Sequence, residues 1–111
     1  LVDTGAAATI VAMSVVQELG LTSQWLDNNA GGAGGVGLAQ YRVEGAELRL
    51  GSFLPQVAGP TGLDFEPINA ALRAQESTEV DLILGVDVFD AHAAVIDYAT
   101  QSLFLKAIST T

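Results

Sequence analysis

Hydrophobic residues along this chain occur in short runs, separated by turn residues at intervals of roughly eight to twelve positions. The run Thr9-Ile10-Val11 is rich in β-branched side chains, which favour a strand. Leu82-Ile83-Leu84 is a second apolar run, and Gly85 ends it. Many short strands with closely spaced turns are typical of a small closed or sandwiched β domain. The pattern therefore predicts an all-β fold.

The alternation of apolar and polar residues predicts further strands. Residues 41–50 alternate on either side of Glu44-Gly45, which predicts a hairpin there. Residues 53–58 predict another strand, near a sheet edge because Pro55 has no N–H to donate. A C-terminal hairpin is predicted from Ala94–Asp97 and Ser102–Lys106 around the turn Tyr98–Gln101, and Gly59–Pro67 is predicted to be a loop.

Short helices are predicted at two places. Ser14 followed by Gln17 fits a capping box, so a helix is expected over residues 14–19. Residues 87–92 follow the second apolar run and predict one or two helical turns, with Asp87 as the cap. Residues 69–75 are rich in alanine and leucine, which favours a helix there, although the segment is short and the pattern is weaker.

Composition limits the classes of function. The chain has 111 residues and a mass of 11.4 kDa, the size of one domain with its own core. It contains no cysteine, which excludes disulfides, thiolate zinc sites and a cysteine nucleophile. Thirteen acidic and four basic residues give a net charge of −9, so nucleic acid is not expected as a partner. No apolar run approaches the ~18 residues that span a bilayer, and no membrane contact is expected.

One carboxylate stands out by its surroundings. The apolar pair Leu1-Val2 leads directly into Asp3, and Thr4-Gly5 then turns the chain. A peptide bond is hydrolysed without a covalent intermediate when one carboxylate takes a proton from water and a neutral carboxylic acid donates to the scissile carbonyl oxygen. Two carboxyl groups that share a site do not both ionise easily, so such a pair carries one proton over an acidic window. Asp-Thr-Gly is also an ordinary turn sequence, and that interpretation stays open here.

A glycine cluster spans residues 31–37. Gly32 to Gly37 fit the pattern G-x-G-x-x-G, which binds a dinucleotide when it follows a strand and opens a helix. Here Asp27-Asn28-Asn29 precedes the cluster, and residues 38–50, which have strand character, follow it. A nucleotide cofactor is therefore not expected. A flexible surface loop remains an alternative.

Three stretches in this order resemble the retropepsin-like aspartic peptidases: LVDTGAAATIV (Leu1–Val11), GGAGGVG (Gly31–Gly37) and LILGVDVF (Leu82–Phe89). The resemblance is to a bacterial or retroviral-type single-domain form. It implies an all-β acid-protease fold, a retropepsin-like closed barrel with two short helices, over residues 1–111. Because only two residues precede Asp3, it also implies a domain that lacks its N-terminal strand or strands.

The resemblance implies roles for particular residues. Asp3 would be the catalytic acid or base, with Thr4 and Gly5 as the scaffold of its loop. One chain holds one such motif, so catalysis would require a homodimer in which Asp3 meets its own copy. A peptide or protein substrate would bind under a flap formed by the glycine cluster, without a cofactor or metal. The implied substrate-binding residues are Ala6, Gly31, Gly32, Ala33, Gly34, Gly35 and Ile83, and the apolar side of Leu103–Leu105 would contribute to the dimer surface.

Other kinds of site have weaker support. His92 is the only histidine, and no serine lies in a G-x-S-x-G elbow, so His92 is expected at the surface or at a helix end. Neither an H-E-x-x-H sequence nor an acidic calcium loop is present, and no metal is expected. Trp25 would either anchor the polar stretch 22–29 or line a specificity pocket. The rival function is a catalytically silent dimerisation or peptide-binding module that keeps the fold and Asp3.

Overall fold

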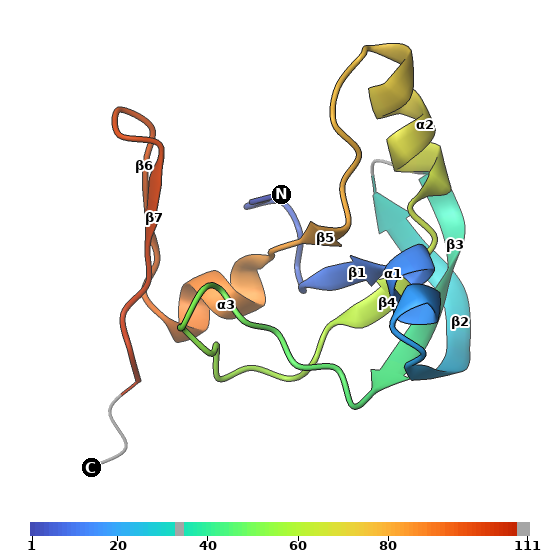
Figure 1. Ribbon diagram of the computed structural model, residues 1–111, viewed down its shortest axis with the longest axis horizontal. Helices are drawn as coiled ribbons and strands as arrows, with labels where there is room; N and C mark the ends of the chain where they lie inside the picture. Colours follow the sequence, from blue (N-terminus) through green and yellow to red (C-terminus); the bar gives the residue numbers. More distant parts are fainter. Residues whose placement is uncertain (33–34, 109–111) are drawn as a thin grey trace.

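The structure is a computed structural model that describes the backbone of residues 1–32 and 35–108, and the side chains of those residues outside 27–38. Five of the described strands form one mixed sheet in the order β2-β3-β4-β1-β5, and two form a separate hairpin, β6-β7. In Figure 1 the hairpin stands apart from the sheet, beyond helix α3. The strands are β1 Ile10–Ala12, β2 Thr22–Gly32, β3 Gly35–Glu44, β4 Thr61–Leu63, β5 Leu82–Ile83, β6 Val95–Asp97 and β7 Ser102–Phe104.

The sheet is open, whereas a closed barrel was expected. Its edge strands are β2 and β5, and neither is paired with the hairpin in the described part of the chain. Residues 46–60 could have continued the sheet, but they hold only the isolated bridge between Leu50 and Phe53. Pro55 and Pro60 remove two backbone donors from this segment, which therefore cannot extend a ladder. The mostly β character agrees with the expectation, and the described strands do not close a barrel.

The Asp3 loop leads into the short strand β1, an interior strand of the sheet that lies between β4 and β5. Ile10 pairs with Thr61 of the parallel strand β4 on one side and with Ile83 of the antiparallel strand β5 on the other. Behind these strands lies a buried cluster of apolar side chains, Ala12, Leu63, Phe65 and Ile83. Burial of this cluster favours the folded state by the hydrophobic effect and fixes the strand from which the loop emerges.

Pairing between distant segments overturns three predictions about strands. Tyr41 does not belong to a hairpin around Glu44-Gly45, because it lies in β3 between Trp25 of β2 and Gly62 of β4. The strand ends just before Gly45, whose φ of 74° departs from an extended conformation. The predicted loop over residues 59–67 contains β4, which is central to the sheet, and residues 53–58 contain no strand beyond the single bridge.

Three helices occur in the described residues, where two were expected: α1 Met13–Glu18, α2 Glu66–Ala74 and α3 Val86–Ala91. The additional one, α2, coincides with the weaker helical pattern and begins earlier, with Pro67 in its first turn. Two capping predictions are wrong, since α1 follows Ala12 with no side-chain cap, and the residue before α3 is Gly85 rather than Asp87. None of these helices has the length and apolar content that crossing a membrane would require.

The C-terminal hairpin is confirmed, with Val95 opposite Phe104 and Asp97 opposite Ser102. One side of it contacts a second apolar cluster formed by Leu84, Val88 and Phe89, against which Leu103 and Leu105 pack. A two-stranded hairpin is only marginally stable by itself, so this cluster is what holds β6 and β7 in place.

Candidate active site around Asp3

The Asp3 loop is attached by backbone hydrogen bonds to the segment that leaves β5. The Asp3 N–H donates to the Leu84 carbonyl at 3.0 Å, and the Val86 N–H donates to the Ala6 carbonyl at 2.9 Å. Val2 forms a parallel bridge with Leu84, so the chain enters the loop alongside the same segment. The pair Leu1-Val2 and the run Leu82–Leu84 therefore lie side by side where the chain enters the Asp3 loop.

The Asp3 side chain is only half-buried. Its Oδ1 accepts the Gly5 N–H at 2.8 Å, and the Ala6 N–H donates to the Asp3 carbonyl at 3.2 Å, which together make a tight turn. A Cβ at Gly5 would lie 3.2 Å from Oδ1, closer than most such contacts, so the glycine lets the turn fold over the carboxylate. The turn engages Oδ1, so Oδ2 stays outside this hydrogen bond.

The neighbouring predicted site residues differ in burial. Thr4 and Gly5 are exposed at the tip of the turn. Ala6 is half-buried and packs against the Ala12–Leu63–Phe65–Ile83 cluster. Ile83 is itself a member of that cluster, with 5% of its surface exposed, so its side chain supports β5 from within. Its assignment to substrate binding stays a prediction.

The glycine cluster lies at the closed end of the β2-β3 hairpin. Gly32 pairs with Gly35, and the ladder contains register shifts between Trp25 and Gly32. Gly31, Gly32 and Gly35 thus belong to the two strands, whereas Ala33 and Gly34 lie outside the described residues. In the sheet, β4 separates this hairpin from β1. The arrangement is a hairpin, as a flap requires, and its role as a flap stays a prediction.

The segment that precedes β5 is fastened to helix α2 by an amide side chain. The Asn69 Nδ2 donates to the Val80 carbonyl at 3.1 Å, and the Val80 N–H donates to Asn69 Oδ1 at 2.7 Å. Asn69 is 7% exposed, so both bonds are shielded from water. Sequence reasoning missed this residue, because an isolated asparagine in a helix carries no signal of a distant backbone partner.

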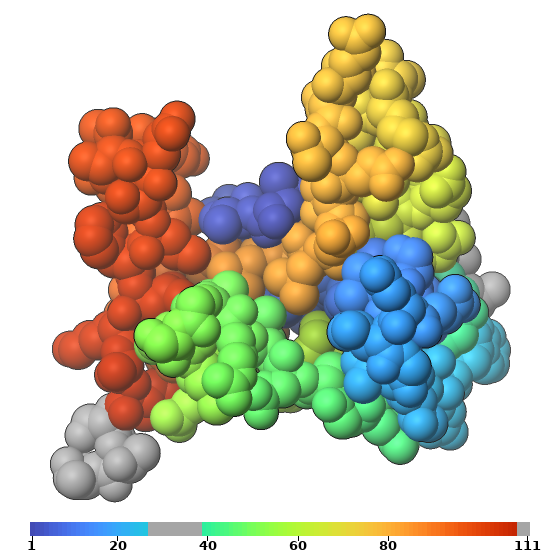
Figure 2. Space-filling model, in the orientation of Figure 1, coloured from blue at the N-terminus to red at the C-terminus, as the bar shows by residue number. Residues whose placement is uncertain are grey.

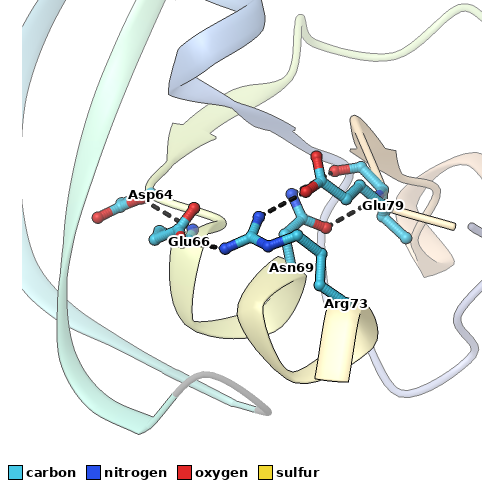
Figure 3. A network of polar contacts seen from close by, with 6 residues as sticks. Asp64, Glu66, Asn69, Arg73 and Glu79 are labelled. Atoms are coloured by element: carbon cyan, nitrogen blue, oxygen red, sulfur yellow. Dashed lines mark hydrogen bonds and ion pairs between the residues drawn. The ribbon is translucent and has the colours of Figure 1, made fainter. Parts of the chain in front are cut away.

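An ion-pair network reinforces the same attachment on the outside of α2. Arg73 donates to the carboxylates of Glu66 and Glu79, as Figure 3 shows beside Asn69. These hydrogen bonds, the one to Glu79 first, raise the pKa of Arg73 above its already high ordinary value. Asp64 accepts the Glu66 N–H at 2.9 Å and so caps the start of this region. Arg73 is exposed, and such pairs contribute little stability.

His92 occupies one of its two expected positions, a helix end, whereas Trp25 does not have the anchoring role that was expected of it. His92 does follow α3, but its ring is buried, with 2% of the residue exposed. Its Nε2 accepts the Gln56 N–H at 3.0 Å, and its Nδ1 lies 2.9 Å from the Lys106 carbonyl, so Nδ1 carries the proton. The ring joins the C-terminal tail to residues 53–56 and has a structural role. Trp25 is 59% exposed on β2, so it does not anchor that segment.

Comparison with known proteins also points to the region around Asp3 as the functional site. A family model described as aspartyl protease matches residues 1–88, which include the Asp3 loop, the β2-β3 hairpin and β5. The chain is 31% identical over 105 residues to DNA damage-inducible protein 1 of Cryptococcus neoformans, covering 92% of this chain and 21% of that protein. It is 33% identical over 110 residues to the protein of the same name from Neurospora crassa, covering 96% and 22%. The chain therefore spans about a fifth of the length of these curated relatives.

Proposed function

Because this chain belongs to the aspartyl protease family, we propose that it is an aspartic endopeptidase that hydrolyses peptide bonds as a symmetric homodimer. Asp3 and its copy in the second subunit form the catalytic pair. Thr4 and Gly5 shape the loop that presents each carboxylate. Residues 1–111 act as the single peptidase domain.

The observation that carries this proposal is the anchored, half-exposed carboxylate of Asp3. Its loop is tied to Leu84 and Val86 by backbone hydrogen bonds, so the carboxylate has a defined position on a packed support. The Gly5 N–H holds Oδ1, and this orients the plane of the carboxyl group. A fixed orientation favours catalysis, because the reacting groups need not be ordered at each turnover.

The reaction needs two carboxyl groups in different protonation states. One ionised Asp3 removes a proton from the attacking water, and the neutral Asp3 of the second subunit donates its proton to the carbonyl oxygen of the scissile bond. The first Asp3 then passes the proton taken from water to the leaving nitrogen, the C–N bond breaks, and the second Asp3 regains its proton from the hydroxyl group as the carbonyl re-forms. Two carboxyl groups that share a site do not both ionise easily, so the pair shares one proton.

The C-terminal hairpin supports the expectation of a dimer. Val95 and Phe104 lie opposite each other on the face that is turned away from the core, and they are 58% and 56% exposed. The predicted apolar surface therefore centres on Phe104, because Leu103 and Leu105 pack inward. A hollow of about 460 Å³ lies between this hairpin and Val2, and Figure 2 shows the N-terminal residues in the recess beside the hairpin. Val95 and Phe104 do not line this hollow, and as an exposed apolar pair they suit association with a second copy.

The substrate is a peptide in extended form, and the β2-β3 hairpin covers it as a flap. Gly31, Gly32 and Gly35 have no side chain that would keep one backbone from approaching another. Ala33 and Gly34, which lie outside the described residues, belong to the same proposed set. Ala6 and Ile83 complete the proposed substrate-binding set. Extended peptides bind such hairpins chiefly through main-chain hydrogen bonds.

The test is cleavage of a denatured protein substrate by wild type, Asp3→Asn and the matched control Asp90→Asn over about pH 3 to 7. Asp90 is an exposed carboxylate on α3, outside the proposed site. We expect cleavage at acidic pH by wild type and control, and its loss in Asp3→Asn. Absence of wild-type cleavage at every pH, with a folded dimer present, would support a silent dimerisation or peptide-binding module instead. Equal cleavage by Asp3→Asn would also refute the proposal.

A further inference from the structure

A buried hydroxyl group connects the end of the Asp3 loop to the start of helix α3. Thr9 is 2% exposed and immediately precedes β1. Its Oγ1 accepts the Gly85 N–H at 3.1 Å and donates to Asp87 Oδ1 at 2.8 Å. The same Asp87 oxygen accepts the Val88 N–H at 2.9 Å. The hydroxyl thus joins three segments through a chain of hydrogen bonds.

The direction of these bonds follows from what each group is able to donate. A backbone N–H is only a donor, so Gly85 occupies a lone pair of the Thr9 oxygen. The single hydroxyl proton of Thr9 then points to Asp87, whose oxygen must accept it. That oxygen also accepts from Val88, so it carries no proton. The geometry requires a threonine or serine at position 9 and an acceptor at position 87.

This chain of bonds completes the attachment of the Asp3 loop. The loop's first part is fixed by the bond from Asp3 to Leu84, and its middle by the bond from Val86 to Ala6. At the last part, the backbone hydrogen bonds described outside the strand ladders include none from residues 7 or 8, and the Thr9 carbonyl accepts the Thr61 N–H at 3.3 Å. The Thr9 hydroxyl adds the side-chain contact that ties this end to Gly85 and Asp87.

We propose that Thr9 and Asp87 are positioning residues, which set the location of the Asp3 carboxylate by holding the far end of its loop against helix α3. This inference rests on the proposed peptidase activity only for its kinetic consequence. The structural consequence, an ordered loop, is independent of it. A displacement of the reacting carboxylate by a fraction of an ångström lowers turnover more than substrate affinity.

The experiment compares two pairs of variants, Thr9→Val with Thr9→Ser and Asp87→Ala with Asp87→Asn. Serine keeps the hydroxyl and asparagine keeps an acceptor oxygen, whereas valine and alanine remove them. Val16→Ala is the control, since it shortens a side chain that is 1% exposed in α1 and lowers stability without touching the loop. Every variant is measured as the full chain, at a temperature where at least about 95% is folded.

Two readouts are taken. The first is amide hydrogen exchange at Asp3, Ala6 and Val86, which we expect to be at least about ten-fold faster in Thr9→Val and Asp87→Ala. The second is kcat and KM on a denatured protein substrate, where the same two variants should lose at least about ten-fold in kcat with KM nearly unchanged. Thr9→Ser and Asp87→Asn should stay within about three-fold of wild type in both readouts.

The outcomes separate the two claims. If Thr9→Val and Asp87→Ala match Val16→Ala in loop exchange and in kcat, the contacts are only stabilising and the positioning role is wrong. If the loop exchanges faster but wild type cleaves nothing, the proposed function fails while the attachment of the loop stands. If Thr9→Val does not fold, the comparison of Asp87→Ala with Asp87→Asn tests the positioning role by itself. Asp87 is half-buried, so its substitution is better tolerated than one at the buried Thr9.

Discussion

A methyl group placed on Gly85 would lie 2.7 Å from the carbonyl oxygen of Ala8, because the Asp3 loop passes directly over the Gly85 backbone. The Ala6 carbonyl oxygen would be 2.8 Å away from the same methyl group. Both neighbours are backbone atoms, which have no flexible end that could move aside. The glycine that ends the second apolar run is therefore required by the loop that carries Asp3.

Gly85→Ala should destabilise the fold by about 1–3 kcal/mol or more, since the loop would have to move as a whole. Gly62→Ala is the control: its methyl group would meet the Met13 sulfur and Val43 Cγ2, and both are side-chain atoms. A methionine side chain moves with little cost, so the loss at Gly62 should be smaller. Urea unfolding of both variants measures the difference. A greater loss for Gly62→Ala would mean that the loop is not held over Gly85.

Asn69→Ala should lower the free energy of unfolding by about 1–3 kcal/mol, because the Val80 N–H and carbonyl lose their shielded partners. Arg73→Ala, one turn further along α2, removes two exposed ion pairs and should cost no more than about 1 kcal/mol. Thermal or urea unfolding checks both. Equal losses would show that the exposed network, not the buried amide, holds α2 to the segment before β5.

His92→Leu should be strongly destabilising. The substitution leaves the Gln56 N–H and the Lys106 carbonyl without their partners, at about 1–3 kcal/mol for each buried group. It also removes the edge-on contact with Phe53, whose ring centre lies 4.9 Å from that of His92. Leu54→Ala, at a half-exposed neighbouring position, is the control and should be nearly neutral. A near-neutral His92→Leu in urea unfolding would contradict the structural role.

Asp97 should stabilise the C-terminal hairpin at neutral pH, and this contribution should be lost in acid. Its pKa lies below the ordinary 3.8, because the Thr100 side chain and then the Ala99 N–H donate hydrogen bonds to its carboxylate. A carboxyl group with a lowered pKa adds stability above its unfolded value, and this stability is lost as the pH falls through the folded value. The stability difference between wild type and Asp97→Ala should therefore shrink as the pH falls below about 4. A difference that is constant over this range would exclude the effect.

Phe104→Lys should weaken the proposed dimer, because it places a charge in the apolar face formed with Val95. Sedimentation at several concentrations measures the association, and activity per chain should fall on dilution sooner than in wild type. Leu19→Lys alters an equally exposed apolar residue, 66% exposed at the end of α1, and should leave association unchanged. Equal effects of the two substitutions would point to non-specific association through apolar surface.

Local patterns were sufficient for the elements that depend on neighbours in sequence. The C-terminal hairpin around Tyr98–Gln101, the run before Gly85 and the helices near residues 13–18 and 86–91 all occur close to their predicted positions. In each case, turn chemistry or a short apolar period acts within a few residues. The catalytic assignment of Asp3 rests on the same kind of local signal and stays a prediction until cleavage is measured.

Local patterns failed where a partner lay far along the chain. The segment 61–63 has the glycine and proline of a loop around it, yet it becomes a central strand because β1 and β3 both pair with it. Residues 41–44 were predicted to begin a hairpin, but they form the end of β3 because they pair with β2 and β4. Strand pairing is decided by registers between distant segments, which single-sequence patterns do not contain.

The sequence by itself determined the chemistry that is present: one Asp-Thr-Gly turn between apolar strands, a glycine cluster, a net charge of −9 and no cysteine. These features follow from residue identity and short spacing. Only the tertiary structure decided how the turn is held, since Leu84, Val86 and Asp87 reach it from more than seventy-five positions away. It also decided that the described strands form an open sheet and that His92 is buried. The physical reason is that packing and hydrogen-bond partners are set by the path of the whole chain in space.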